Sequence, residues 1–177
     1  MRIISGKYKG KRLMAPKKLP VRPTTDFAKE ALFNIIYNKI DFDEVSLLDL
    51  FSGTGNISFE FASRGTQEIT SVDAHFGCVK YVNQISDELD FSIKTVKSDV
   101  FKYLKTTPFT FDVIFADPPY NLEQEKFETI ANKTFERNLL NEDGFLIIEH
   151  SKHTDLSNVS RFVEARRYGG SVFSFFE

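Results

Sequence analysis

Cysteine, histidine and tryptophan are scarce in this chain of 177 residues, which has one, three and none of them. The single cysteine, Cys78, excludes an intramolecular disulfide, and we expect a reducing, cytoplasmic setting. Cys78 and the histidines lack the spacing of metal ligands, so we expect no metal site. We interpret His75, His150 and His153 as polar surface residues, and Cys78 as part of a packed helix.

Long apolar runs are also missing. No segment approaches the roughly 20 apolar residues of a transmembrane helix. No hydrophobic segment follows a basic start at the N-terminus, so we expect neither a secretory signal nor a membrane partner. The composition is normal for a globular protein, with 41% hydrophobic and 27% charged residues. The length fits one domain with a substantial core, much of which must be filled by the 19 phenylalanines.

Positive charge is concentrated at the N-terminus, although the whole chain has a net charge of −2. Residues 1–22 contain no acidic residue and eight basic ones, namely Arg2, Lys7, Lys9, Lys11, Arg12, Lys17, Lys18 and Arg22. Subtracting these eight from the 23 basic residues leaves 15 against 25 acidic residues, a charge of −10 for residues 23–177. We interpret the segment as a basic arm for a phosphate backbone, with a solvated tail as the alternative. The residues predicted to contact the polyanion are Arg2, Lys7, Lys9, Lys11 and Arg12.

The arm also contains apolar residues, which favour an ordered β-hairpin over a loose tail. Ile3 and Ile4 lie in its first half and Leu13 in its second. We expect residues 2–5 to pair with residues 10–14, and the two prolines that follow to start a linker. The expected division is therefore a basic hairpin or arm at 1–22 and a second domain at 23–177.

Strands and helices are expected to alternate along the rest of the chain. A helix begins at Thr25 or Asp26, with an apolar stripe formed by Phe27, Ala28, Ala31, Leu32, Ile35 and Ile36. Five buried strands are expected at 47–50, 68–72, 92–96, 111–116 and 145–148, with helical patterns between them at 56–63, 78–89, 100–104 and 127–134. The end of the chain reads as a β-hairpin of 162–168 and 172–176. This alternation predicts an α/β fold, with a mostly parallel sheet covered by helices on both faces.

Aspartates follow four of these strands. Asp49, Asp73, Asp99 and Asp117 lie at or just beyond the ends of successive strands, the edge where parallel sheets bind ligands. Asp73 comes 20 residues after Gly53, where an acid can hold the two hydroxyls of a ribose. The glycine turn at Gly53-Thr54-Gly55 lacks the third glycine of a dinucleotide fingerprint, and Asp49 suits an ammonium or sulfonium better than a pyrophosphate. The aspartates and the glycine turn together indicate a binding site for S-adenosylmethionine (SAM), with a dinucleotide as the alternative ligand.

The segment Asp117-Pro118-Pro119-Tyr120 forms a slot suited to a flat ring that bears an amine. The Asp117 carboxylate and the Pro118 carbonyl can each accept one amine hydrogen, and Tyr120 can stack on the ring face. Proline fixes the backbone, so the acceptors sit in a stiff frame. An ordinary proline-rich turn is the alternative interpretation.

Four motifs occur in order: DLFSGTG at 49–55, VDA at 72–74, SDVF at 98–101 and DPPY at 117–120. In this order they resemble the SAM-dependent methyltransferases of exocyclic amines. More narrowly, RIISGKYKG at 2–10 followed by RPTTD at 22–26 resembles the bacterial RsmD family of small-subunit (16S) rRNA guanine-N2 methyltransferases. The resemblance covers essentially the whole chain. It implies a Rossmann-like class I methyltransferase fold with a mostly parallel seven-stranded sheet and a C-terminal antiparallel hairpin.

The resemblance also implies roles for individual residues. Those that would hold SAM are Arg22, Thr24, Asp49, Phe51, Gly53, Gly55, Asn56, Asp73, Ala74, Asp99 and Val100. Among them, Asp99 would bind the adenine amine. Asp117, Pro118 and Tyr120 would hold the target base. The implied partner is ribosomal RNA within a small-subunit particle, met by a monomer.

Four other functions remain open from the sequence. The same slot could take adenine N6 of DNA or RNA, or a glutamine side chain of a protein. The glycine turn could serve a dinucleotide-dependent oxidoreductase. The basic arm could belong to a non-catalytic RNA-binding protein that keeps a relict pocket.

Overall fold

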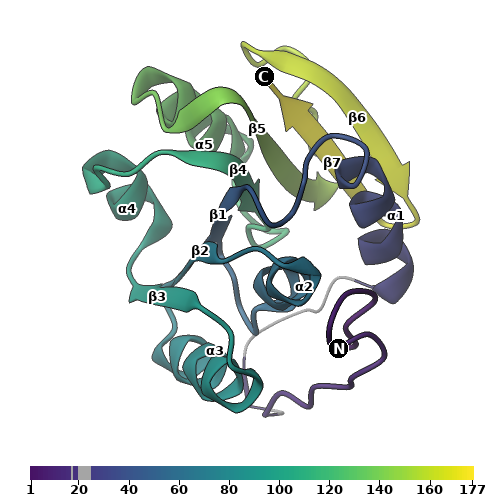
Figure 1. The fold of residues 1–177 in the computed structure, drawn as a ribbon. Helices are drawn as coiled ribbons and strands as arrows, with labels where there is room; N and C mark the ends of the chain where they lie inside the picture. The colour runs from purple at the N-terminus through teal and green to yellow at the C-terminus, as the bar shows by residue number, and fades with distance from the viewer. Residues whose placement is uncertain (17, 20–24) are drawn as a thin grey trace.

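A seven-stranded sheet in the order β3-β2-β1-β4-β5-β7-β6 crosses the computed structural model, which describes residues 1–16, 18–19 and 25–177 (Figure 1). The strands are β1 (Ser46–Leu50), β2 (Glu68–Asp73), β3 (Ile93–Lys97), β4 (Phe111–Ala116), β5 (Leu140–Ser151), β6 (Phe162–Tyr168) and β7 (Ser171–Phe176). The first five are parallel, whereas β7 runs antiparallel to β5 and β6. The predicted α/β fold, with its parallel sheet and C-terminal hairpin, is confirmed.

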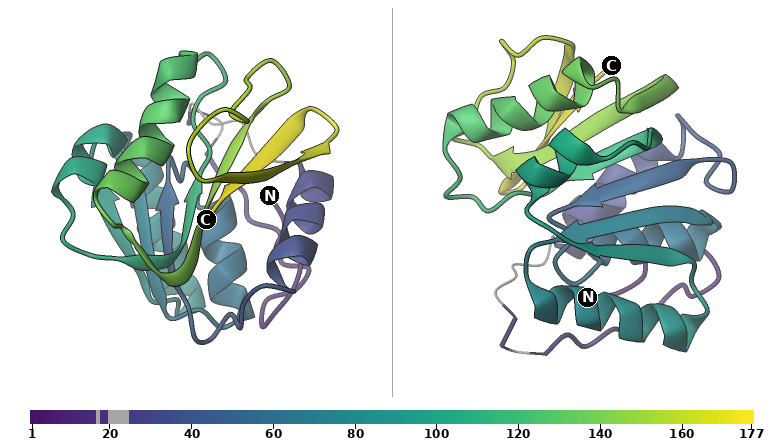
Figure 2. Two further views of the ribbon diagram at one scale, coloured as in Figure 1. Left: turned by 90° about the horizontal axis from the view of Figure 1, so that it is seen from above. Right: turned by 90° about the vertical axis from the view of Figure 1, so that its left-hand side faces the viewer.

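Helices cover both faces of the sheet. They are α1 (Asp26–Ile36), α2 (Asn56–Arg64), α3 (Phe76–Leu89), α4 (Val100–Thr106) and α5 (Gln124–Glu136). Figure 2 shows α1 and α2 on one side of the strands and α4 and α5 on the other. Two separate apolar clusters follow from this arrangement, one beneath α1 and α2 and the other beneath α4 and α5. None of the described helices is long and apolar enough to cross a membrane.

Alternate residues of the central strands enter opposite clusters. Leu47 of β1 and Phe115 of β4 pack beneath α1 and α2, whereas Leu48 and Ile114 pack beneath α4 and α5. Successive side chains of a strand point to opposite faces, so a strand buried on both faces is apolar at every position. This register also fixes which side chains meet at the carboxyl ends of the strands.

The first helix begins as predicted, but its buried stripe is shifted so that it leaves out Phe27. Thr25 is its N-cap, and its Oγ1 accepts a hydrogen bond of 3.2 Å from the amide of Ala28. Phe27 was expected in the core but is 67% exposed, while Lys29 and Phe33 are buried instead. The helix is turned because Lys29 has a buried counter-ion on α2, while Phe27 packs edge to face on Tyr168. Ala28, Leu32 and Ile36 are buried as expected.

The N-terminal arm has the expected pairing but only a single β-bridge, between Arg2 and Arg12. The amide of Ile3 donates to the carbonyl of Lys11 at 3.0 Å, so the two halves lie antiparallel. Ile3 and Leu13 are buried against side chains of α2 and α3. The arm is therefore docked on the body. The proposed division between residues 22 and 23 falls outside the described residues and stays a prediction.

One histidine departs from expectation. His75 and His153 are exposed, but His150 is buried near the carboxyl end of β5. Its Nε2 lies 2.8 Å from Ser174 Oγ and its Nδ1 lies 2.9 Å from the Ser151 carbonyl. Burial lowers the pKa of His150, so the ring is neutral at physiological pH. The prediction of a surface residue was wrong here because β5 extends past residue 148 into the interior of the sheet.

Candidate functional site

Acidic residues replace apolar ones where three strands end on one face of the sheet. Leu47, Phe115 and Ile147 pack beneath α1 and α2. Two positions further along each strand, on the same face, come Asp49, Asp117 and Glu149. The sheet thus presents a row of carboxylates at its carboxyl edge.

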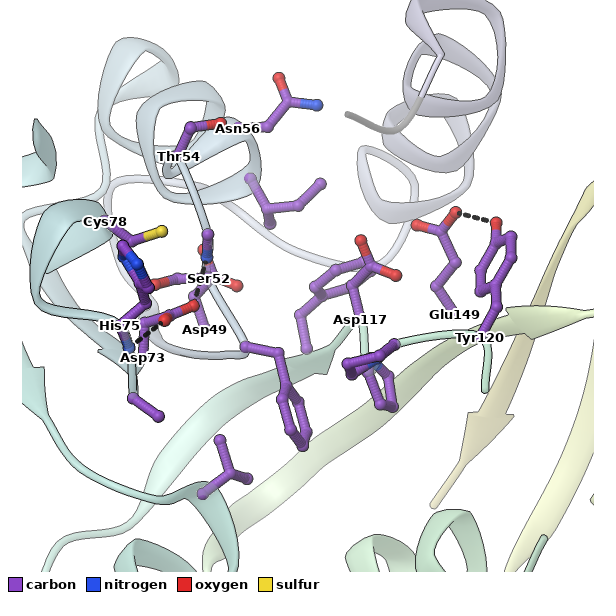
Figure 3. A pocket seen from close by; sticks show the side chains of 18 of the residues that line it. Asp49, Ser52, Thr54, Asn56, Asp73, His75, Cys78, Asp117, Tyr120 and Glu149 are labelled. Carbon is purple, nitrogen blue, oxygen red and sulfur yellow. Dashed lines mark hydrogen bonds between the residues drawn. The ribbon is translucent and has the colours of Figure 1, made fainter. Parts of the chain in front are cut away.

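A cavity of about 540 Å³ lies at this edge, a volume in the range of small-molecule sites. Predicted site residues that line it are Asp49, Phe51, Gly53, Asn56, Asp73, Ala74, Asp99, Val100, Asp117, Pro118 and Tyr120. Figure 3 shows the labelled members from the glycine turn and from the segment after β4 facing the same space. Residues predicted to hold a methyl donor and residues predicted to hold a base therefore share one cavity.

Other predicted site residues lie elsewhere. Gly55 does not line the cavity; it is the N-cap of α2 with a φ of 74°, and a Cβ there would lie 3.0 Å from the Phe59 ring. Gly55 therefore shapes the turn that leads into α2. Arg22 and Thr24 lie outside the described residues. The five basic residues of the arm do not line the cavity.

Asp49 is the buried member of the acidic set. Its Oδ2 accepts hydrogen bonds from the Ser58 amide at 3.1 Å and the Ser58 hydroxyl at 2.6 Å. Burial raises the pKa of Asp49 to about 7, although the Ser58 hydrogen bonds oppose this shift. A large share of these carboxyls is therefore protonated at neutral pH, and a cation in the cavity would favour the ionised form.

Asp73 joins the ends of two strands. Its Oδ2 accepts from the Gly53 amide at 2.8 Å and its Oδ1 from the His75 amide at 2.7 Å. Phe51 and Gly53 have φ values of 57° and 52°, the left-handed backbone that brings the turn toward Asp73. Each carboxylate oxygen can accept a second hydrogen bond, so the fixed Asp73 side chain remains able to accept from ligand hydroxyls.

Asp99 and Val100 occupy the start of α4. Asp99 is the N-cap, and its Oδ1 accepts from the Lys102 amide at 2.9 Å. Val100 is buried and lines the cavity beside it. An acidic acceptor next to an apolar surface suits the amine and the face of an adenine ring.

Asn56, the first residue of α2, provides a test of what the cavity can hold. Its Oδ1 accepts from Lys29 Nζ at 2.9 Å, whereas its buried Nδ2 has no acceptor among the described residues. An unsatisfied buried donor is costly, and a helix N-terminus favours an anionic group. A ligand carboxylate would satisfy both, and SAM carries a carboxylate, an ammonium, a ribose and an adenine. The residues present fit SAM.

Glu149 and Ser171 also line the cavity and were missed. Ser171 Oγ donates to Glu149 Oε1 at 2.7 Å. The Tyr120 hydroxyl lies 3.5 Å from the same oxygen (Figure 3). A signal for Glu149 existed, because it directly follows the apolar run expected as the fifth strand. Ser171 had no such signal, since it depends on the placement of β7. Other unpredicted lining residues are Thr25, Ser52, Thr54, Ile57, His75, Cys78, Phe115 and Pro119.

Cys78 is buried in α3 as expected, and burial raises the pKa of its thiol to about 11. The thiol is therefore uncharged at neutral pH and contributes apolar surface to the cavity. Among the described residues, no group of three or more His, Cys, Asp and Glu side chains could hold a metal ion.

Solved structures show the class to which this fold belongs. A structure described as “Putative methyltransferase yhhF from Escherichia coli” has a TM-score of 0.86 at 20% identity and covers 99% of this chain and 96% of that one. A structure described as “Crystal structure of SMU.776, a putative methyltransferase complexed with SAH” (S-adenosylhomocysteine) has a TM-score of 0.68 at 18% identity, over 84% of this chain and 49% of that one. The fold is that of the Rossmann-like methyltransferases.

Sequence relatives identify the family. A family model described as “Conserved hypothetical protein 95” matches residues 1–177. “Putative rRNA methyltransferase YlbH” of Bacillus subtilis is 35% identical over 161 residues, 88% of this chain and 85% of the relative. “Ribosomal RNA small subunit methyltransferase D” of Buchnera aphidicola is 31% identical over 150 residues, 84% of this chain and 75% of the relative. The chain belongs to this family, the RsmD family of methyltransferases. Membership excludes the oxidoreductase hypothesis.

Proposed function

We propose that this protein transfers a methyl group from SAM to the exocyclic N2 of a guanine in small-subunit ribosomal RNA. The supporting observation is that one cavity is lined both by Asp49, Asp73 and Asp99 and by the segment Asp117–Tyr120. The names of the relatives support ribosomal RNA as the substrate. The exposed basic side chains of Lys7, Lys9 and Arg12 on the arm support a contact with its phosphates.

The cofactor half of the cavity would hold SAM through groups of complementary charge and hydrogen-bonding character. Asp49 would face the cationic part of the ligand, Asp73 the ribose hydroxyls and Asp99 the adenine amine. Asn56 Nδ2 would donate to the carboxylate of SAM. When bound, SAM supplies an electrophilic methyl group on its sulfonium sulfur.

The base half of the cavity makes the guanine amine a better nucleophile. The lone pair of N2 is delocalised into the ring, so the free amine is nearly planar and reacts poorly. The Asp117 carboxylate and the Pro118 carbonyl would accept hydrogen bonds from its two N–H groups, which favours a tetrahedral nitrogen and stabilises the positive charge that develops on it. The N2–methyl bond would form as the sulfur–methyl bond breaks, and the Asp117 carboxylate would take the proton that the methylated amine then loses. Tyr120 stacks on the ring and fixes its orientation toward the cofactor half. Removing the base from its stack costs roughly a few kcal/mol, which phosphate contacts of the arm offset.

Product analysis tests this function. The purified protein is incubated with SAM and small ribosomal subunits from a strain that lacks the modification, and the digested RNA is analysed by mass spectrometry. We expect N2-methylguanosine at one position. N6-methyladenosine, or a methylated glutamine in a ribosomal protein, would replace the proposal with the corresponding amine target. No transfer to the RNA or to protein would contradict it.

Replacing Asp117 tests the assigned chemistry. Asp117→Ala should lower kcat by about 100-fold or more, because it removes the charged acceptor of the amine. SAM affinity measured by calorimetry should remain within about threefold of wild type, since Asp117 contacts the base half. Asp87→Ala, on the exposed surface of α3, is the matched control and should leave both values unchanged. Turnover retained in Asp117→Ala would refute the role.

A further inference from the structure

The base half of the cavity contains, besides the half-buried Asp117, a fully buried carboxylate, that of Glu149, which the proposed chemistry does not use. Glu149 is 1% exposed and lines the cavity with Asp117 and Tyr120. The parallel pairing of β4 and β5 matches Ala116 with Ile148. Asp117 and Glu149 therefore follow as neighbours on adjacent strands and share one face of the sheet.

Hydroxyl groups from two other segments hold the Glu149 side chain. Ser171 Oγ on β7 lies 2.7 Å from Oε1 and 3.3 Å from the Tyr120 hydroxyl, which itself lies 3.5 Å from Oε1. In Figure 3 the carboxylate lies between Asp117 and Tyr120, with one oxygen bonded to the Tyr120 hydroxyl and the other turned toward Asp117. Burying a carboxylate is costly unless hydrogen bonds hold it, and these hydroxyls contribute such bonds. Two carboxylates are thus presented to the same ring.

Two neighbouring carboxylates match guanine and not adenine. In guanine the N2 amine lies next to the N1–H group, so this edge of the ring offers adjacent donors. In adenine the N6 amine is flanked by the unprotonated N1, which is an acceptor. A carboxylate beside Asp117 would accept the N1–H of guanine, but it would meet the lone pair of N1 in adenine. Buried polar sites that hydrogen-bond a donor reject analogues that lack it.

We propose that Glu149 determines the choice of base by accepting the N1–H of the target guanine, with Ser171 and Tyr120 fixing its position. This inference rests on the proposed function and deepens it. Asp117 and the Pro118 carbonyl take the amine, whereas Glu149 recognises the ring nitrogen beside it. Tyr120 then acts twice, because its ring stacks on the base while its hydroxyl orients Glu149.

The wild-type enzyme allows a first test without any substitution. Two short RNAs are compared, one with the target guanosine and one with 2,6-diaminopurine ribonucleoside in its place. The analogue keeps the 2-amino group but has an acceptor at N1. We expect kcat/KM for guanosine to exceed that for the analogue by about 10- to 100-fold, the range of one good base contact. Equal values would overturn the inference.

Glu149→Gln provides the second test. Its amide can donate to N1 of the analogue, so the preference for guanosine should fall to about threefold or reverse. Glu142→Gln is the matched control, with the same change at an exposed position near the other end of β5. It should keep the wild-type preference. Thermal unfolding and SAM binding establish that both variants are folded.

The outcomes separate this inference from the function on which it rests. If the wild type makes no N2-methylguanosine, the proposed function fails. If it does so but Glu149→Gln keeps the wild-type preference, the role of Glu149 alone fails. A general loss of rate on both RNAs with an unchanged ratio would likewise assign Glu149 to packing and not to base choice.

Discussion

Individual aspartates of the site have the same side chain but very different surroundings. Asp49 is buried and bonded to Ser58, Asp73 ties the Gly53 turn to the end of β2, and Asp99 caps α4. Burial raises the pKa of Asp49 to about 7. The surroundings of Asp49 therefore make its carboxyl responsive to pH in the physiological range.

The affinity for SAM should rise with pH because the Asp49 carboxyl becomes ionised. The folded-state pKa of Asp49 lies near 7, so the carboxyl is mostly protonated at pH 6 and mostly ionised at pH 8. A cationic ligand prefers the ionised form. SAM affinity should therefore increase by about tenfold between pH 6 and pH 8, as measured by titration calorimetry.

Asp49→Asn separates this effect from the ligand's own titration. The α-amino group of SAM loses its proton near pH 8, like other α-amino groups, and contributes a dependence of its own. The variant keeps that contribution but lacks the carboxyl. Asp49→Asn should bind SAM more weakly than the wild type at pH 8, and its SAM affinity should stay constant or fall as the pH rises. A profile that rises as steeply as that of the wild type would contradict the role of Asp49.

Neighbouring elements are joined by a buried ion cluster that links the arm to the cavity. Lys29 Nζ of α1 lies 3.3 Å from Glu60 Oε2 of α2, and Arg64 Nη2 lies 3.0 Å from Glu60 Oε1. The Glu60 carboxylate also accepts the amides of Ile4 and Ser5 at 2.8 and 3.0 Å. Burial lowers the pKa of Lys29, and the Glu60 charge opposes that shift. The cluster depends on Glu60 as the single carboxylate that holds all of these groups.

Lys29 extends the same cluster to the cofactor half of the cavity. It donates to the Arg2 carbonyl at 2.5 Å and to Asn56 Oδ1 at 2.9 Å. Asn56 lines the cavity, so the position of the arm and the orientation of a cavity amide share one buried ammonium. The arm is therefore held by the residues that shape the site.

Removing the central charge should loosen both the fold and the arm. Glu60→Gln keeps the volume but leaves Lys29 buried without its counter-ion, which should lower the free energy of unfolding by about 3–5 kcal/mol in urea titrations. Trypsin should cleave after Lys7 or Lys9 faster than in the wild type, because the arm amides lose a charged acceptor.

A surface pair of the same kind provides the control. Glu88 on α3 pairs with Lys11 at 3.0 Å, and both side chains are well exposed. Glu88→Gln should cost less than about 1 kcal/mol and leave the arm protected. If Glu60→Gln and Glu88→Gln lower the free energy of unfolding by the same small amount, the buried cluster does not hold the arm.

Across the molecule, charge is separated between a basic arm and an acidic body. The arm packs on α2 and α3, whereas α5 covers the opposite face of the sheet. Lys7, Lys9 and Arg12 are exposed, while Arg2 and Lys11 are engaged with Asp26 and Glu88. RNA affinity should therefore depend on salt through the exposed residues of the arm.

The salt dependence gives a count of these contacts. Each phosphate contact adds about 0.7–0.9 to the slope of log K against log salt concentration. Lys7→Ala combined with Lys9→Ala should reduce the magnitude of the slope by about 1–2 in filter-binding or anisotropy titrations. Lys126→Ala with Lys133→Ala on α5 removes the same charge from the other face and should leave the slope unchanged. Equal losses from both pairs would indicate a general charge effect.

Local patterns in the chain were sufficient to predict most of the fold and one row of the site. Asp73, Asp99 and Asp117 could be placed together because they follow parallel strands, whose carboxyl ends meet at one edge. The segment 117–120 could be read as an amine slot because its acceptors and its ring are close in sequence. These features depend on periodicity and short spacing, which a linear sequence records directly.

Contacts between distant segments could not be predicted in this way. Glu149 meets Ser171 because β7 inserts between β5 and β6, and Lys29 meets Glu60 because α1 is rotated enough to leave Phe27 in solvent. Strand order and helix rotation are set by the packing of the whole core, since many alternatives satisfy the same local pattern. The amino-acid sequence alone determined the edge of the sheet at which the predicted site residues gather, and three-dimensional packing placed a further carboxylate, that of Glu149, in the same cavity.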